Sequence, residues 1–298
     1  MKTGTEALSA RFVGVDLPPS LIVPQGDAWP QPRSDVIKHP EVMHLGMRRG
    51  VDADRRLAEI VAEARTRNVP QVTILLIAEG VNVVRQASRI IDRLNAYADI
   101  VEVVLFARGQ VAAVPSWLAQ RIQSWREEKF TSIDFDLDKL PASSSYRYDE
   151  IVTAWTGPTH TLTVIPHLDK DRTGDALLDR FVTWMKIPTV PATTSARVNS
   201  SLGREALVAL GEFKRRLAWM RSNRLTNTVA AFLFNRARRR FRSEPGERWV
   251  LTAPQKRAIA ASYAESNRAL KKWLGGKARR TEWVAWFSEV EKFAPKSR

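Results

Sequence analysis

The chain has 298 residues, of which 44% are hydrophobic and 27% charged, a composition typical of a globular protein with one or two domains. It contains no cysteine, which excludes disulfides, thiolate metal sites and a cysteine nucleophile. The net charge of +15 lies in the last third, because residues 201–298 hold 23 basic and 8 acidic residues while the first 200 are neutral. Such a distribution suggests an anionic partner: a nucleotide, an acidic glycan, a membrane surface or nucleic acid.

The first part of the chain alternates helix-like and strand-like segments. A helix is expected at 4–12, and the prolines of 13–40 exclude a continuous helix or central strand there, so this segment is interpreted as a long ordered loop. Buried apolar runs separated by helices are typical of parallel strands covered on both faces, which predicts an α/β fold with a doubly wound layer. The further expected elements are helices at 52–67, about 82–97, about 111–129 and 175–186, and strands at 71–80, 99–108 and 159–166.

The last third is predicted to be helical and to pack on this core, which divides the chain into 1–200 and 201–298. Helical spacing of apolar residues covers about 202–220, and residues 232–242 add five arginines to an apolar stretch. The sequence Thr252-Ala-Pro-Gln255 fits a capping box that opens a helix to about 274. A last helix around 283–287 is expected to pack back onto the body.

Targeting and metal-binding patterns are absent from the sequence. It has no run of 18 apolar residues and no apolar segment typical of a signal peptide at its start, so a cytoplasmic location is expected. None of its four histidines forms an H-E-x-x-H pair, and no metal is expected.

Two short patterns are suited to binding phosphate. Lys2, Thr3, Gly4 and Thr5 precede a helix, where backbone N–H groups can surround an anion and Lys2 adds a mobile cation. The alternative is an N-terminal segment with no site. Arg108 ends the strand at 99–108 and Ser116 follows in the next helix, where the pair could hold a second phosphate. The alternative here is a surface arginine and a helix cap.

Together these patterns resemble the P-loop sulfotransferases, which use 3′-phosphoadenosine 5′-phosphosulfate (PAPS). The resemblance implies a P-loop-type three-layer fold, with Lys2 to Thr5 as the 5′-phosphosulfate loop and Arg108 with Ser116 as the 3′-phosphate site. The bacterial carbohydrate-type branch is the most similar, on the stretches VVLFARGQVAAVPSWLAQRI, Tyr148–Trp155, Asn199–Leu202 and LTAPQKRAIAASYAESNRAL.

The resemblance also implies the chemistry. Lys2 would stabilise charge on the leaving phosphate, and a carboxylate at Glu79 would act as general base towards the acceptor hydroxyl. Glu79 could instead cap a helix or pair with an arginine. His44 is the second candidate base, with an ordinary loop histidine as its alternative.

Three features depart from the family pattern. The strand that precedes the lysine in the family is absent from this chain, so we expect residues 1–5 to lie loosely and an edge of the strands at 71–80 or 99–108 to be unpaired. Glu6 stands where the family often has threonine. Pro115 directly precedes Ser116, which predicts a helix that starts late or is kinked.

Three functional hypotheses follow. The first is a PAPS-dependent sulfotransferase acting on a hydroxyl of a glycan or glycolipid, with peripheral contact to a membrane surface through the basic C-terminal region. The second is a non-catalytic remnant of that fold. The third is a basic anion- or nucleic-acid-binding protein, against which the lack of any nucleic-acid motif argues.

Overall fold

The computed structural model describes residues 12, 17–24, 39–47, 51–77, 84–133, 146–168, 175–186, 202–242, 247 and 249–294. In this part of the chain the fold is mixed α/β and mostly helical, with two small parallel sheets. The expected division at residue 200 lies outside the described residues.

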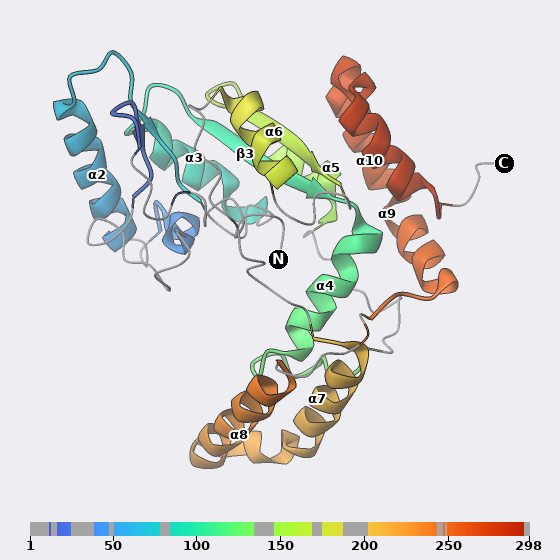
Figure 1. Cartoon of the computed structure of the whole chain (residues 1–298). Coiled ribbons are helices and arrows are strands. Elements are labelled where there is room, and N and C mark those ends of the chain that lie inside the picture. The colour runs from blue at the N-terminus through green and yellow to red at the C-terminus, as the bar shows by residue number, and fades with distance from the viewer. Residues whose placement is uncertain are drawn as a thin grey trace.

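The longer sheet consists of two parallel strands, β3 (Glu102–Arg108) and β4 (Thr161–His167). They pair in register from Glu102 opposite Thr161 to Arg108 opposite His167. Both strands were predicted from their apolar runs, and their parallel pairing is confirmed. Their carboxyl ends therefore lie side by side (Figure 1).

Helices cover both faces of this sheet. On one face, α6 (Asp175–Met185) packs Phe181 against Phe106, with ring centroids 6.0 Å apart. On the other face, Val103 and Leu105 belong to a buried cluster that also contains residues of α3 (Ala87–Asn95), α5 (Tyr148–Ala154) and α10 (Thr281–Glu291). Successive side chains of β3 thus point alternately into two different hydrophobic clusters, as expected for a strand covered on both faces.

A second, very short sheet corrects the interpretation of the proline-rich segment. Within it, β1 (Leu21–Ile22) pairs in parallel with β2 (Thr73–Ile74). The prolines flank β1 and do not interrupt it, so a two-residue ladder is compatible with them. Among the described residues neither sheet pairs with the other, so within this part of the chain an edge of β2 and an edge of β3 have no strand partner.

A buried histidine joins the ends of this short sheet. The backbone N–H of Ile77 donates to Nδ1 of His39 (2.8 Å), so Nε2 carries the proton and donates to the carbonyl of Pro24 (2.8 Å). The backbone N–H of His39 donates in turn to the carbonyl of Ile77 (2.7 Å). Next to it lie η1 (Pro40–His44) and α2 (Val51–Thr66), the latter within one residue of its predicted bounds.

Two predicted helices differ from the structure. The segment expected as a helix at 82–97 begins as η3 (Val84–Gln86) and continues as α3. The helix expected at 111–129 is α4 (Gln110–Ile122), which starts early and runs through Pro115, so the prediction of a late start was wrong. Because proline has no N–H, the carbonyl of Val111 lacks its helical hydrogen bond.

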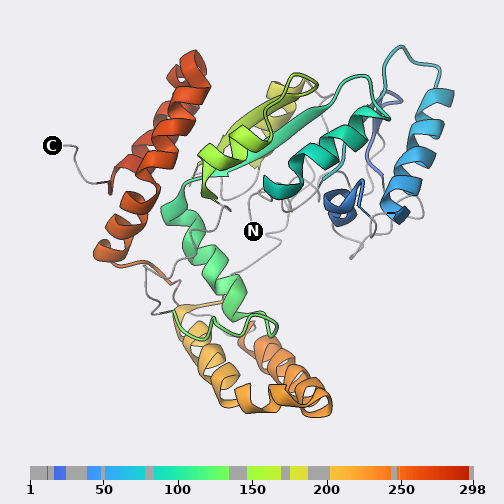
Figure 2. The ribbon, with the colours of Figure 1, turned by 180° about the vertical axis from the view of Figure 1, so that it is seen from behind.

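The last third forms a helical hairpin and two helices that return to the sheet. The hairpin consists of α7 (Arg204–Arg216), η7 (Ala218–Ser222) and α8 (Arg224–Arg242). Figures 1 and 2 show it projecting from the body beyond the far end of α4. We call residues 204–242 the α7–α8 hairpin.

The return to the body follows the sequence prediction. α9 (Ala253–Leu274) opens with the predicted capping box: Thr252 Oγ1 accepts from the N–H of Gln255 (3.4 Å), and Gln255 Oε1 accepts from the N–H of Thr252 (2.9 Å). After η8 (Gly275–Arg279), α10 packs on the sheet, where the indole N–H of Trp286 donates to the carbonyl of Ala107 (2.9 Å). Within the described residues, no helix has the length and apolar character needed to cross a membrane.

Candidate functional site

The carboxyl ends of β3 and β4 bring two basic residue types together. Arg108 and His167 are the last residues of their strands and are direct neighbours in the ladder. Helix α4 begins two residues after Arg108, so its N-terminal N–H groups lie at the same edge. In parallel α/β sheets this edge is where ligands bind, and a cation beside a helix N-terminus favours an anion.

The backbone N–H and the backbone carbonyl of Arg108 are both held by hydrogen bonds to one tyrosine. Its N–H donates to the hydroxyl of Tyr148 (2.7 Å), and that hydroxyl donates to the carbonyl of Arg108 (2.7 Å). Gly109 lies so close to α10 that an added Cβ would meet Cγ1 of Val290 at 3.0 Å. The position of the arginine is therefore fixed by α5 and α10, not by its own loop alone.

A buried amide pair fixes the start of α4. Nε2 of Gln110 donates to Oδ1 of Asn267 (2.7 Å) and to the carbonyl of Tyr146 (3.2 Å). Nδ2 of Asn267 donates back to Oε1 of Gln110 (3.2 Å). Both amides are buried, and the pair joins residues 157 positions apart. It locks α9 to the helix that follows Arg108.

Near Arg108, the phenols of Tyr146 and Tyr148 are neutral and the carboxylate of Asp149 is ionised. Burial raises the pKa of Tyr146 and of Tyr148 well above the usual range, although the charge of Arg108 acts in the opposite direction. At the start of α5, hydrogen bonds from Arg147 (3.1 and 2.8 Å) lower the pKa of Asp149 to about 2. Asp149 is thus paired with Arg147, and the two phenols near Arg108 carry no charge.

Ser116 lies further from the sheet than its sequence spacing suggests. It is half-buried on α4, six residues after the first residue of the helix, which corresponds to about 9 Å along the axis. Ala112 is four residues earlier and therefore on the same face of α4. An anion held by both Arg108 and Ser116 would lie along this face.

The remaining predicted site residues are not brought to this edge by the described structure. His44 is exposed at the end of η1, within the part of the molecule formed by α2 and α3. Lys2, Thr3, Gly4, Thr5 and Glu79 lie outside the described residues. Within the described residues there is no group of three or more side chains with metal-ligating chemistry.

Sequence reasoning missed several residues of this edge. His167 could have been found, because it ends the strand neighbouring that of Arg108, and the same rule about carboxyl ends applies to it. Gln110 and Asn267 could not, since nothing local indicates that residues so far apart will pair.

Comparisons with known proteins give no relative. No family model matches the chain, no curated protein matches it, and no solved structure matches it.

Proposed function

We propose that this protein is a sulfotransferase that moves a sulfuryl group from PAPS to a hydroxyl of a glycan or glycolipid. The observation that carries the proposal is the place of Arg108, at the carboxyl end of a parallel strand and directly before a helix that carries Ser116. In the resembling family an arginine and a serine so placed bind the 3′-phosphate. The proposal includes that family's P-loop-type three-layer fold, which the helices on both faces of β3 and β4 support.

The reaction assigns a step to each predicted residue. The acceptor oxygen attacks sulfur, the bond from sulfur to the bridging oxygen breaks, and 3′-phosphoadenosine 5′-phosphate leaves. Lys2 and the backbone of Thr3 to Thr5 stabilise the negative charge on the departing phosphate. Glu79 takes the acceptor proton, and His44 is the alternative base.

Calorimetric titration tests the nucleotide site. Arg108→Ala is expected to weaken binding of 3′-phosphoadenosine 5′-phosphate by roughly thirtyfold or more, because a charge-assisted contact is lost, and to change binding of adenosine 5′-monophosphate little. Arg126→Ala, an exposed arginine beyond α4, is the matched control. Equal weakening of both nucleotides by Arg108→Ala, or no nucleotide binding by the unaltered chain, would contradict the proposal. Nucleotide binding without transfer to any acceptor would support the non-catalytic remnant.

A second proposed activity, peripheral binding to an anionic membrane surface, has support from α8. Leu225 (78% exposed), Val229 (51%) and Phe232 (59%) follow one another at helical spacing, so three apolar side chains share an exposed face. The same helix carries six arginines and no acidic residue. An exposed apolar stripe with clustered cations has the chemistry of a helix that lies on an anionic lipid surface.

Vesicle sedimentation separates this surface from nucleic-acid binding. Vesicles with anionic headgroups should bind the protein, and uncharged vesicles should bind it much less. Phe232→Ser should reduce association severalfold, since its ring no longer enters the lipid boundary. Val208→Ser on α7 is the control. Tighter binding to duplex DNA than to the vesicles would favour the nucleic-acid hypothesis instead.

A further inference from the structure

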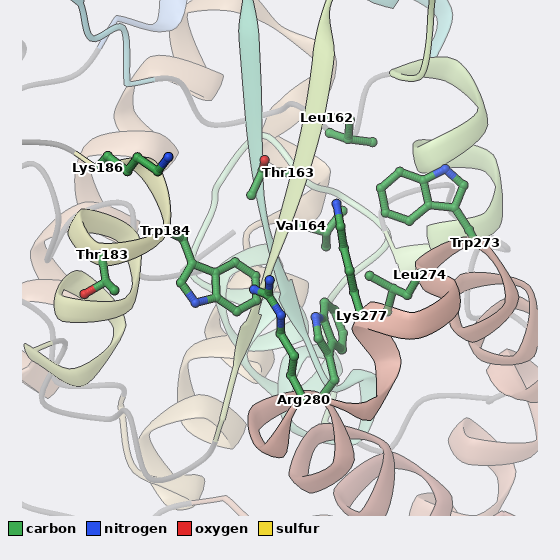
Figure 3. Close-up of a pocket in the computed structure, with 11 residues that line it drawn as sticks. Leu162, Thr163, Val164, Thr183, Trp184, Lys186, Trp273, Leu274, Lys277 and Arg280 are labelled. Atoms are coloured by element: carbon green, nitrogen blue, oxygen red, sulfur yellow. The ribbon is translucent and has the colours of Figure 1, made fainter.

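A pocket of about 440 Å³ lies beside β4 (Figure 3). Leu162, Thr163 and Val164 all contribute to it, although consecutive side chains of a strand point to opposite faces. The pocket therefore lies across the edge of β4 and not over one face. Among the described residues β4 pairs only with β3, so no strand of this part of the chain occupies its other edge. The other walls come from α6 and from the segment that joins α9 to α10.

Three cations surround this space. Lys186 reaches it from the end of α6, and Lys277 and Arg280 reach it from η8 and the start of α10 (Figure 3). No aspartate or glutamate is among the lining residues, and no ion pair of these three cations is found within the described part of the chain. Three positive charges with no carboxylate between them favour a ligand with more than one negative charge.

Aromatic side chains shape the same pocket. Trp184, Trp273 and Trp283 line it, and the guanidinium of Arg280 lies 5.0 Å from the centre of the Trp184 ring. This cation–π contact orients the planar guanidinium before any ligand is present. Trp283 is fully buried, and its indole N–H has no hydrogen-bond partner among the described residues.

The backbone at one cation is unusual. Lys186 follows the last residue of α6 with a φ of 52°, a left-handed conformation that glycine or asparagine normally adopts at a helix end. A lysine in this conformation is strained, because its Cβ crowds the backbone. The strained backbone carries one of the three cations that line the pocket.

We propose that this pocket binds an acidic saccharide, one with sulfate or carboxylate groups on pyranose rings. Indole faces pack against the C–H face of a pyranose, and the cations pair with its acidic groups. The lining side chains are mostly donors, with only two threonine hydroxyls as acceptors, which suits a ligand rich in acceptor oxygens. A nucleobase fits less well, because no amide or carboxylate side chain is present to pair with its edges.

This site is separate from the one at Arg108. Leu162 to Val164 precede His167 by three to five residues, which is about 10 to 16 Å along the strand. The saccharide pocket therefore stands apart from the proposed sulfuryl transfer and can be tested without nucleotide.

Calorimetry with a disaccharide of uronic acid and sulfated glucosamine tests the proposal. The double variant Lys186→Ala/Lys277→Ala should weaken binding by about tenfold or more, because two charge-assisted contacts are lost. Lys129→Ala/Lys272→Ala removes the same charge from exposed positions outside the pocket and should change affinity by less than about twofold. Trp273→Leu keeps the charge and should weaken binding about fivefold through loss of the indole face.

Several outcomes would overturn the proposal. One is equal weakening by the two double variants, which would mean that only the overall charge matters. Others are equally tight binding of maltose or of free sulfate, since the first lacks charge and the second lacks rings. Displacement of the disaccharide by 3′-phosphoadenosine 5′-phosphate in the Arg108→Ala variant would assign the pocket to nucleotide. Conversely, Arg108→Ala should leave disaccharide affinity unchanged, so the two proposals can fail independently.

Discussion

The end of β3 and the outer face of α8 use polar groups in opposite ways. Around Arg108, the backbone, Tyr148, Trp286 and the Gln110–Asn267 pair satisfy one another inside the molecule. On α8, the apolar side chains of Leu225, Val229 and Phe232 are exposed, and so are Arg236 and Arg239. In the first region polar groups fix one residue in place, whereas the outer face of α8 presents apolar and charged side chains at the surface. This contrast predicts where substitutions change stability and where they change only association.

One of the contacts that join the hairpin to the body is a buried cation. Lys214 is 1% exposed, and its ammonium donates to the carbonyls of Arg121 (3.0 Å), Glu127 (2.5 Å) and Phe130 (3.0 Å). Burial lowers its pKa to about 8, so it remains mostly protonated at pH 7. One turn earlier, Gly211 packs so tightly that an added Cβ would meet the carbonyl oxygen of Thr131 at 2.1 Å. Both residues hold the segment after α4 against α7.

A large loss of stability is therefore expected from Lys214→Met. The variant keeps most of the volume but leaves three carbonyls without their donor, and it should lower the free energy of unfolding by about 3 kcal/mol. Urea denaturation followed by circular dichroism measures the change. Arg215→Ala, the exposed neighbour on α7, should stay within about 0.5 kcal/mol of the unaltered protein. A similar loss in both variants would show that the hairpin is not anchored by this ammonium.

A smaller loss is expected at the other region from Gln110→Leu. The substitution leaves the amide of Asn267 buried without its partner, which should cost about 2 kcal/mol. The double variant Gln110→Leu/Asn267→Leu should cost less than the sum of the single variants, because the orphaned amide is removed as well. Strict additivity in this double-mutant cycle would show that the amides do not act as a pair.

Comparison of the sequence predictions with the structure shows which elements have local determinants and which depend on distant residues such as Lys214. The capping box of α9 and the strands β3 and β4 were predicted because their determinants are local: a four-residue motif and short apolar runs. The end of α4 was predicted seven residues too late, since its determinant is Lys214, more than eighty residues away.

The last third was predicted to be helical, but the start of α8 was not located. The apolar residues before 232 face solvent and do not follow a buried stripe, so the sequence pattern does not mark where the helix begins. At the candidate site, Arg108 could be proposed from its place at the end of an apolar run. The tyrosines, the amide pair and the cationic pocket beside β4 depend on tertiary contacts that no sequence window contains.

Asp149→Asn is expected to lower the free energy of unfolding by about 1 kcal/mol, and this loss should be seen in full only above about pH 4. The pKa of Asp149 is about 2 in the folded protein against an ordinary value of 3.8, so its ionised form is stabilised by folding. This contribution is complete above pH 4 and is lost as the pH falls through about 2. The difference in unfolding free energy between the two proteins should therefore shrink over that range.

The smallest effect on stability is expected on the exposed face of α8, where Phe232→Ser removes an aromatic ring. Because the ring is 59% exposed, its removal should change the free energy of unfolding by less than about 0.5 kcal/mol. Phe234, two residues further on, is fully buried and packs on Trp125 with ring centroids 5.5 Å apart. Phe234→Ser should therefore cost about 3 kcal/mol or more. Comparable losses for both phenylalanines would mean that the outward face of α8 is covered in the folded protein, and the contrast between the two regions would no longer hold.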